Sequence, residues 1–529
     1  MKPVYSLLLS FLLFTQLHVL ANNIRVSNPG AGRDIQPALQ AAANRAHNGD
    51  VLIVPAGQFV LNKSVVITRM LSVQGAGIGK TILYRAANAD DNLLTNSSAW
   101  DGMLHFTLTT NQPSGIVVSG ITFRSKQPSL VLGDSLSLAA DVGIKLEHCY
   151  NFVVHSCRFE YFGCAAVFVV HDDSIVGGLI NNNQFFHNAK GPDALGLGYG
   201  VVIFGENLKW IVNPRLGSSN FIFVEDNTFD FHRHSIAAGG CALYVFRHNK
   251  VINNIAGGGD HAIDAHAARL TPGLNYYGTR AVEVYNDSVV NTTFKDGTPI
   301  IPGQRAQLLS NNAVLIKSGD AIIHDIYVQG YRFAVGIIDD QVSGVQNYPI
   351  STQSGYNSGL AYGPNHTGVA DGRGDGDLFT WNNTFTPYVS QDTSSIFYNF
   401  QPEYFVAERD FHTYAKPAYA TYTYPHPLAS TSSHAPLGID EPTPVVASPS
   451  NNQYALFPTP ASDIIHLVTE QNDTRNVLEI FALNGTFVSS QTLTEKQTLL
   501  DVSAFAPGCY FLRITGQNGT EVHKAFITR

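Results

Sequence analysis

The sequence predicts an all-β chain: a parallel β-helix, which is a solenoid of stacked short strands, followed by a small antiparallel β-sandwich. The first observation is a short sequence motif that recurs along the chain. It consists of a hydrophobic residue, a polar corner built on Asn or a substitute, and a second hydrophobic residue. Its copies are Val118-Ser-Gly-Ile-Thr-Phe123, Ile180-Asn-Asn-Asn-Gln-Phe185, Val224-Glu-Asp-Asn-Thr-Phe229, Phe246-Arg-His-Asn-Lys-Val251 and Val284-Tyr-Asn-Asp-Ser-Val289. Irregular multiples of about two dozen residues separate them, as expected for a coil that closes one turn and starts the next. The second observation is composition, since short runs of Val, Ile, Phe and Tyr between Gly, Asn and Asp favour strands and turns.

A solenoid pairs each turn with its neighbours, so small apolar side chains stack inside and the outer face of a long sheet stays available to a ligand. The chain has 529 residues, more than one compact core usually holds, but a solenoid grows by adding turns. Charged residues make up 14% and the net charge is -9, which excludes a basic surface for nucleic acid. We therefore expect function on an outer sheet face.

Residues 1–21 read as an export signal. Lys2 gives a positive start, Leu7 to Phe14 form an apolar run, and Ala21 ends a cleavage site of small residues. The apolar run is shorter than the roughly 20 residues that a bilayer requires, and no later segment reaches that length. We expect a secreted or outer-surface attached chain that has no transmembrane segment after signal removal. The five cysteines are expected to fill the core: Cys149, Cys157, Cys164, Cys241 and Cys509.

A short amphipathic helix is expected from Asp34 to Ala46, with Asp34 as its cap and Gly49 as its stop. It precedes the first strand and would cover the open end of the solenoid. Together with Pro55-Ala-Gly57 and Val73-Gln-Gly-Ala-Gly77, this helix resembles the start of the pectate-lyase-like superfamily of right-handed β-helices. The resemblance implies the fold and polysaccharide as partner. It implies chemistry only loosely, because the superfamily holds lyases, glycosidases, epimerases and proteins without known activity.

The β-helix domain is expected over residues 22–428. Its turns continue to about Asp340, residues 341–377 form one long excursion, and residues 409–428 resemble the closing segment of many exported bacterial β-helix proteins. Ser, Thr and Pro dominate residues 429–452, which predicts an extended linker.

Residues 453–529 alternate as an antiparallel sandwich would, for example in Val477-Leu-Glu-Ile-Phe481 and Gly508-Cys-Tyr-Phe-Leu-Arg-Ile514. They closely resemble the C-terminal sorting domain of the type IX secretion system of Bacteroidota. The resemblance implies that these residues bind the secretion machinery and have no catalytic part. The alternative is a carbohydrate-binding or fibronectin-like module, and we expect the whole chain to be a monomer.

Ionisable residues gather in two consecutive turns, residues 231–239 and 259–269, and in the following strand, residues 279–285. With Ile203, Ile236 and Ile263 in one inward stack, strand alternation places Asp264 and His266 on one outer face. The same parity places Arg233 beside Asp260 on neighbouring turns and points His234 and His261 into the interior. A β-bulge would invert these assignments.

Three chemistries fit this region. Proton abstraction beside a uronate carboxylate, as in a lyase or epimerase, requires a base and positive charge. We assign His266 as base, Asp264 as its orienter or acid, and Arg269 and Arg280 as charge stabilisers. Substrate binding is assigned to Arg233, Asp260, Arg247 and Glu283.

Glycoside hydrolysis would instead require two carboxylates, for which Asp260, Asp264 and Glu283 are the local candidates. Metal binding by Asp260, His261, Asp264 and His266 ranks lowest, because alternation divides this set between two faces. We therefore predict no metal ligands here. The cofactor stays undetermined, with calcium as a candidate at residues 371–377, where a flexible turn is the better interpretation.

The favoured prediction is thus an exported polysaccharide lyase, or a related glycoside hydrolase or epimerase. The rival prediction is a non-catalytic surface solenoid that binds glycans or acts as an adhesin, because solenoids often serve as scaffolds.

Overall fold

The computed structural model divides the chain into two compact units, Met1–Ala435 and Pro436–Arg529. It describes residues 21–86, 101–113, 115–126, 141–172, 176–188, 198–206, 213–253, 261–266, 269–271, 274–276, 278–292, 312–338, 378–386, 395–400, 407–408, 410–431, 454–457, 464–469, 476–482, 487–493, 497–506, 508–516 and 519–527. Residues 1–20 of the predicted export signal, the excursion at residues 341–377 and most of the predicted linker lie outside these residues. Among the described residues, no helix is long and apolar enough to span a bilayer.

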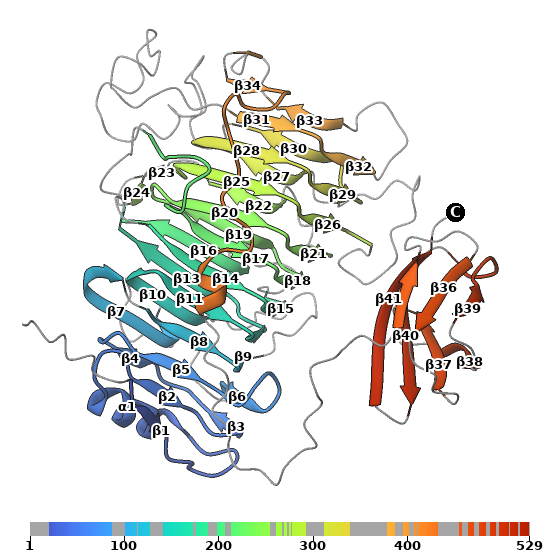
Figure 1. Ribbon diagram of the computed structural model, residues 1–529. Helices are drawn as coiled ribbons and strands as arrows, with labels where there is room; N and C mark the ends of the chain where they lie inside the picture. The colour runs from blue at the N-terminus through green and yellow to red at the C-terminus, as the bar shows by residue number, and fades with distance from the viewer. Residues whose placement is uncertain are drawn as a thin grey trace, which may run out of the picture. The chain divides into compact units, whose positions relative to one another are not determined.

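The first unit is the predicted parallel β-helix, with three long parallel sheets among its described residues (Figure 1). Parallel strands joined by crossovers of this kind wind right-handed. Sheet A runs through β1 (Asn23–Arg25), β2 (Val51–Ile53), β5 (Ser72–Gln74), β8 (Val117–Ser119), β11 (Phe152–His155), β14 (Gly178–Asn181), β17 (Ile222–Glu225), β20 (Leu243–Arg247), β25 (Ala281–Tyr285), β28 (Asp320–His324), β31 (Leu378–Trp381) and β34 (Phe411–His412).

Sheet B runs through β3 (Gly57–Val60), β6 (Thr81–Tyr84), β9 (Thr122–Arg124), β12 (Arg158–Glu160), β15 (Gln184–Phe186), β18 (Thr228–Asp230), β21 (Lys250–Ile252), β26 (Ser288–Val290), β29 (Tyr327–Gln329) and β32 (Thr384–Thr386). Sheet C runs through β4 (Val65–Ile67), β7 (Gly102–Pro113), β10 (Val142–Tyr150), β13 (Ala165–His171), β16 (Tyr199–Gly205), β19 (His234–Gly239), β22 (His261–Ala265), β27 (Asn312–Ile316), β30 (Phe333–Ile337) and β33 (Ser395–Asn399). A separate antiparallel hairpin joins β23 (Arg269–Thr271) to β24 (Leu274–Tyr276).

The recurring motif of the sequence is the corner between sheets A and B. A residue with positive φ comes first in each corner: Gly120, Ser156, Asn182, Asp226, His248, Asn286, Asp325 and Asn382. The next residue turns inward, and where it is Asn or Asp its side chain accepts the backbone N–H of the equivalent residue one turn earlier. This asparagine ladder runs from Cys157 through Asn183, Asn227 and Asn249 to Asp287, with N···O distances of 2.7–3.0 Å. The left-handed backbone explains why Asn, Asp and Gly recur there.

Aromatic side chains stack in the interior beside this corner. Phe123, Phe159, Phe185 and Phe229 lie one above another in sheet B, with ring centroids 4.5–5.3 Å apart. Offset stacking of this kind adds to the energy of simple burial. Of the predicted core cysteines, Cys149, Cys157, Cys164 and Cys241 are buried, and the side chain of Cys509 is not described.

The predicted helix covers the N-terminal end of the solenoid as α1 (Gln36–Arg45). Its Leu39, Ala42 and Ala43 belong to the interior core. The structural N-cap is Ile35 rather than Asp34. Asp34 still stabilises the first turn, because its carboxylate accepts the N–H of Gln36 at 2.9 Å.

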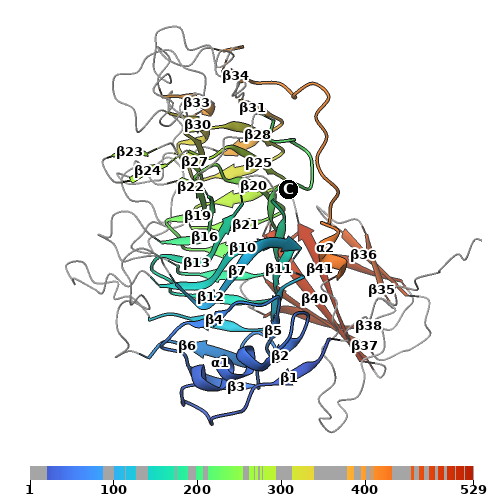
Figure 2. The same cartoon turned by 90° about the vertical axis from the view of Figure 1, so that its left-hand side faces the viewer.

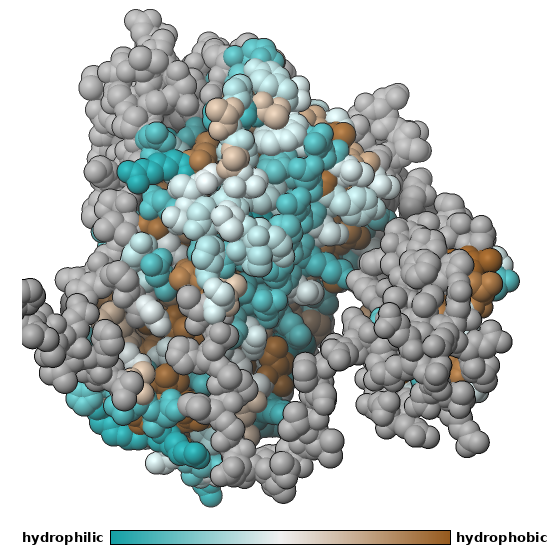
Figure 3. Space-filling view, in the orientation of Figure 1, coloured by the Kyte–Doolittle hydropathy of each residue, from teal (hydrophilic) through white to brown (hydrophobic). Residues whose placement is uncertain are grey.

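The predicted closing segment, described over residues 410–428, returns from β34 along the outer face of sheet A to the short helix α2 (Leu428–Thr431), which contacts β14 (Figures 1 and 2). Buried charges hold it there. The Arg247 guanidinium donates to the carbonyls of Tyr422 and Thr423 at 2.8 and 2.9 Å. In the space-filling view this face shows mainly hydrophilic and neutral residues (Figure 3).

The second unit contains two antiparallel sheets. One consists of β35 (Tyr454–Phe457), β36 (Ile464–Thr469) and β39 (Gln497–Asp501), and the other of β37 (Asn476–Ala482), β38 (Phe487–Leu493), β40 (Gly508–Gly516) and β41 (Gly519–Ile527). Alternating side chains from both sheets, among them Ile465, Leu478 and Leu512, form one core. The alternation read from the sequence is therefore the alternation of a sandwich.

Candidate functional site

The side chains of sheet C do not follow simple strand alternation. In β13, Ala166 and Val167 both belong to the interior core, whereas Ala165 and Phe168 belong to an outer cluster. Two adjacent residues thus point inward at the start of the strand, so the alternation of inward and outward side chains is offset by one residue. A β-bulge produces the same kind of offset.

The same shift occurs in β22 and changes the predicted site. Ala262 and Ile263 both point into the core, so His261 and Asp264 flank them on the outer side. His234 is in register with Tyr199, which packs against the outer cluster. The prediction that His234 and His261 point into the interior is therefore wrong.

The predicted stack needs a smaller correction. Ile236 is in register with Ile263, as expected, but Ile203 is in register with Ala238. The slip is two residues, so it leaves the face assignment of Asp264 unchanged.

Asp264 is the centre of the site. Its Oδ1 lies 2.8 Å from Nε2 of His261 and 3.5 Å from Nζ of Lys317. Its Oδ2 lies 3.3 Å from Nδ1 of His266. The Asp264 side chain is 4% exposed and that of His266 is 29% exposed, so the cluster reaches solvent through His266.

The electrostatics of the cluster follow from these contacts. Burial alone would raise the pKa of Asp264, but the three bases around it outweigh burial and hold its pKa well below the usual range. Burial, helped by the neighbouring positive groups, holds the pKa of His234 well below its usual value. The cluster therefore contains an ionised carboxylate and a neutral imidazole.

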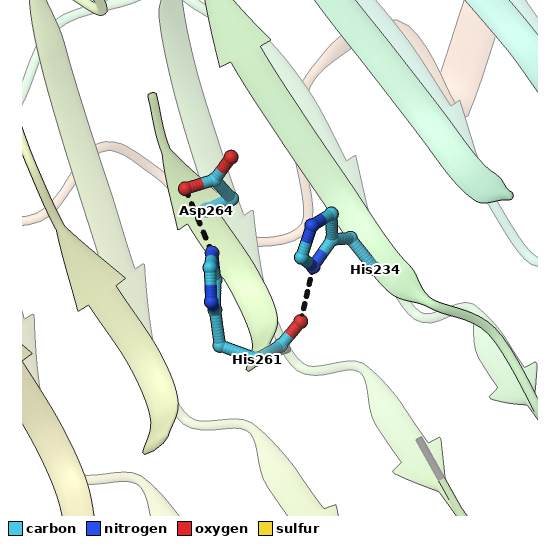
Figure 4. A group of neighbouring side chains, drawn as sticks. All are labelled: His234, His261 and Asp264. Carbon is cyan, nitrogen blue, oxygen red and sulfur yellow. Dashed lines mark hydrogen bonds and ion pairs between the residues drawn. The ribbon is translucent and has the colours of Figure 1, made fainter. Parts of the chain in front are cut away.

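A column of rings leads into the cluster. Tyr199 stacks on His234 with centroids 5.5 Å apart, and the ring of His234 lies 4.4 Å from the His261 ring. Nδ1 of His234 donates a hydrogen bond to the backbone carbonyl of His261 (Figure 4). Arg233 closes the column, with Nη1 donating to the Tyr199 hydroxyl at 2.9 Å.

The structure brings Asp264 and His266 together as predicted, and Arg233 lies at the edge of the same cluster. Arg280 is buried, and its Nη1 lies 2.7 Å from Oδ2 of Asp320. Arg269 begins β23, but its side chain is not described. Asp260 lies outside the described residues, so its predicted pairing with Arg233 stays a prediction.

Arg247 and Glu283 lie elsewhere, on sheet A beneath the closing segment. Nη2 of Arg247 lies 2.6 Å from Oε2 of Glu225, with both side chains fully buried. Glu283 accepts the N–H of Gly217 at 2.7 Å and the hydroxyl of Tyr419 at 2.5 Å. These contacts assign both residues to attachment of the closing segment, and the structure does not place them near Asp264.

Sequence reasoning missed Lys317. It follows β27, which is in register with β22 through Ile263–Val314 and Ala265–Ile316. Extending this register by one residue places Lys317 beside His266. Lys317 could have been found from the sequence as the lysine three residues after Val314, the inward residue of the next turn.

A second polar cluster lies on the same sheet at β7 and β10. Nε2 of His105 and Nζ of Lys145 each lie 2.6 Å from a different oxygen of Glu147. Burial opposes ionisation of Glu147, but these two partners lower its pKa to about 2. Apolar side chains, among them Phe168 and Phe204, lie between the two clusters.

The comparisons with known proteins agree with this division of the chain. Residues 455–528 match the family model described as the secretion system C-terminal sorting domain. The second unit is thus a sorting domain, and the chain is exported as cargo of a secretion system, to be released or attached at the cell surface. The search of curated proteins returned no match.

Solved structures resemble the chain only distantly. ORF18 of Geobacillus virus E2 is 10% identical, with 95% of this chain and 76% of that chain covered and a TM-score of 0.39. The catalytic domain of a GH87 alpha-1,3-glucanase, in complex with nigerose, is 12% identical, with coverage of 74% and 67% and a TM-score of 0.35. PfbA, a surface adhesin of Streptococcus pneumoniae, is 11% identical, with coverage of 69% and 91% and a TM-score of 0.35. Such values carry no argument about activity.

Proposed function

We propose that the exported β-helix is a polysaccharide-active enzyme that abstracts a proton from the sugar ring beside a uronate carboxylate, as a lyase or an epimerase does. The observation that carries this proposal is the pairing of a half-buried His266 with the buried carboxylate of Asp264. The substrate is a uronic-acid polysaccharide, and the acting form is a monomer.

Asp264 supports His266 as the base. A carboxylate oxygen 3.3 Å from Nδ1 favours the tautomer that has its proton on Nδ1. Nε2 then carries the lone pair that takes a proton from substrate. The backbone of His266 is also fixed, because its N–H donates to the Ala238 carbonyl at 3.1 Å and its carbonyl accepts the N–H of Thr279 at 2.9 Å.

Lys317 supports the second requirement, positive charge near the reacting carbon. Abstraction beside a carboxylate develops negative charge on the carboxylate oxygens, and a nearby ammonium stabilises it. Lys317 takes the role assigned from the sequence to Arg280, whose guanidinium is committed to Asp320. Arg269 remains a candidate for the same role.

Hydrolysis receives less support. It requires two carboxylates on either side of the scissile bond. Among the described residues, the ion-pair partners of the Asp264 carboxylate are His261, His266 and Lys317, which are all bases. Of the other two carboxylates proposed from the sequence, Glu283 belongs to sheet A and Asp260 is not described.

A non-catalytic glycan binder is the second candidate. The observation that favours it is the strip of Phe168, Phe204 and Tyr199 on the same sheet face as both polar clusters. Aromatic and apolar side chains of this kind can pack against sugar faces without any chemistry. In that case the chain binds polysaccharide and releases no product.

The test is turnover of uronic-acid and neutral polysaccharides, followed by the absorbance of unsaturated products, by new reducing ends and by the epimer ratio. His266→Ala should lower turnover by about 100-fold or more, while its thermal transition stays within a few degrees of the parent. His105→Gln is the matched control, because it alters a histidine–carboxylate pair in the other cluster of sheet C. Unchanged turnover in His266→Ala, or binding without product in the parent chain, would refute the proposal.

A further inference from the structure

The proposed base mechanism leaves two histidines of the cluster without a role. It uses His266, Asp264 and Lys317. His234 and His261, which lie beside Asp264 in Figure 4, take no part in it. One potential ligand atom from each of His234, His261 and Asp264 lies within 4.8 Å of the other two, and all three residues are buried. The geometry points to a binding site for a divalent transition-metal ion of the zinc class, formed by these three residues.

The hydrogen bond of His234 prepares it as a ligand. Its Nδ1 donates to the backbone carbonyl of His261, so the neutral ring carries its lone pair on Nε2. Histidines that bind metals usually donate their other ring N–H to a carbonyl or carboxylate, which fixes the tautomer and the ring orientation. Burial keeps the pKa of His234 low, so protons do not compete for this nitrogen near neutral pH.

His261 and Asp264 complete the set. Two ligands bonded to one tetrahedral zinc ion at about 2.0–2.1 Å lie about 3.3 Å apart. Nε2 of His261 is 2.8 Å from Oδ1 of Asp264, so these atoms need to separate by about half an ångström. Two imidazoles and one carboxylate suit zinc, cobalt or iron better than calcium, which prefers an all-oxygen shell.

Lys317 opposes the ion. Its ammonium lies 3.5 Å from the same carboxylate oxygen and would repel a dication bound there. Removing this charge should therefore tighten metal binding. A variant that gains affinity cannot be explained by misfolding, which makes Lys317→Met the decisive substitution.

The test uses the full chain, treated with a chelator and dialysed, and needs no substrate. Zinc chloride is titrated by calorimetry, and cobalt chloride by visible absorption, which reports nitrogen and oxygen ligation. We expect one equivalent bound. Affinity should fall at least tenfold in His234→Ala and in Asp264→Asn, rise in Lys317→Met, and stay unchanged in His105→Ala.

Absence of stoichiometric binding would overturn the inference. Binding that His234→Ala leaves unchanged would also overturn it, because the ion would then lie elsewhere in the chain. A thermal melt of each variant checks that the solenoid is folded. Turnover measured in the presence of chelator tests the base mechanism separately, so the metal site and the proposed function can fail independently.

Discussion

Asp287 occupies a position of the asparagine ladder where an amide would serve better than a carboxylate. In the preceding turns the ladder amides of Asn227 and Asn249 each donate to a carbonyl of the turn before, those of Ile180 and Val224, at 2.9 Å. By the same geometry an amide at position 287 would donate to the carbonyl of Phe246. Ionised Asp287 cannot donate, and among the described contacts its Oδ2 is buried without a hydrogen-bond partner.

We therefore expect Asp287→Asn to stabilise the solenoid. The substitution keeps the acceptor that receives the backbone N–H and the side-chain N–H of Asn249 at 2.7 and 3.1 Å. It removes one buried unsatisfied oxygen, which costs about 1–3 kcal/mol. Where Asp287 is ionised, the gain should lie in that range, because shape and volume are unchanged.

The pH dependence gives the sharper check. Burial raises the pKa of Asp287 well above its usual value, against the hydrogen bonds from Asn249. The carboxyl of Asp287 therefore binds its proton more tightly in the folded protein than in the unfolded chain. As the pH rises from the pKa of the unfolded state through the pKa of the folded state, this carboxyl progressively lowers the free energy of unfolding. The advantage of Asp287→Asn should therefore be larger at pH 7 than at pH 4.

Equilibrium urea unfolding at both pH values measures this difference. Asn249→Asp is the matched control, since it introduces the same carboxylate one turn earlier and should destabilise at pH 7. A gain that is equal at both pH values, or a loss of stability in Asp287→Asn, would refute the assignment of a buried, under-satisfied carboxylate.

Three further perturbations test other parts of the fold. Phe185→Ala removes a ring stacked between two others and should cost about 3–5 kcal/mol in urea unfolding, whereas a cost below about 1 kcal/mol would contradict close packing. Burial lowers the pKa of His171 from 6.5 to about 4. The contribution of His171 to the free energy of unfolding is therefore fully present above pH 6.5, and it falls by up to about 3 kcal/mol as the pH approaches 4. His171→Gln should flatten this part of the stability profile, and an unchanged slope would contradict the assignment. Arg247→Met leaves Glu225 buried without its charge partner, at a cost of about 3–5 kcal/mol, and should make the closing segment sensitive to limited proteolysis, whereas Arg513→Met, at an exposed pair, should change stability by less than about 1 kcal/mol.

The corner motif could be predicted from sequence because it has a local cause. A left-handed residue followed by an inward amide requires particular residue types, and Asp226 with Asn227 is one such pair. The corner can therefore be recognised within a single turn. The outward placement of Asp264 could also be predicted, because the inward position of Ile263 fixes its neighbour.

The rest of the site could not be predicted, because it depends on contacts between turns. His261 points outward because Ala262 and Ile263 both face the core. Two adjacent inward positions of this kind cannot be recognised from the residue types. Lys317 lies far from Asp264 in the sequence, and only the register between β22 and β27 brings the two together. Arg247 and Glu283 resembled binding residues for the same reason, since the closing segment that buries them comes much later in the chain.

The ladder has a consequence for how such a chain can change. Successive ladder residues are 26, 44, 22 and 38 positions apart, yet the hydrogen bonds between them have nearly the same length. The scaffold therefore tolerates inserted sequence of very different size, as long as it leaves and re-enters at a corner. New recognition loops can be added to one turn while the neighbouring turns keep their pairing. Binding specificity can therefore change during evolution without a change in the stability of the solenoid.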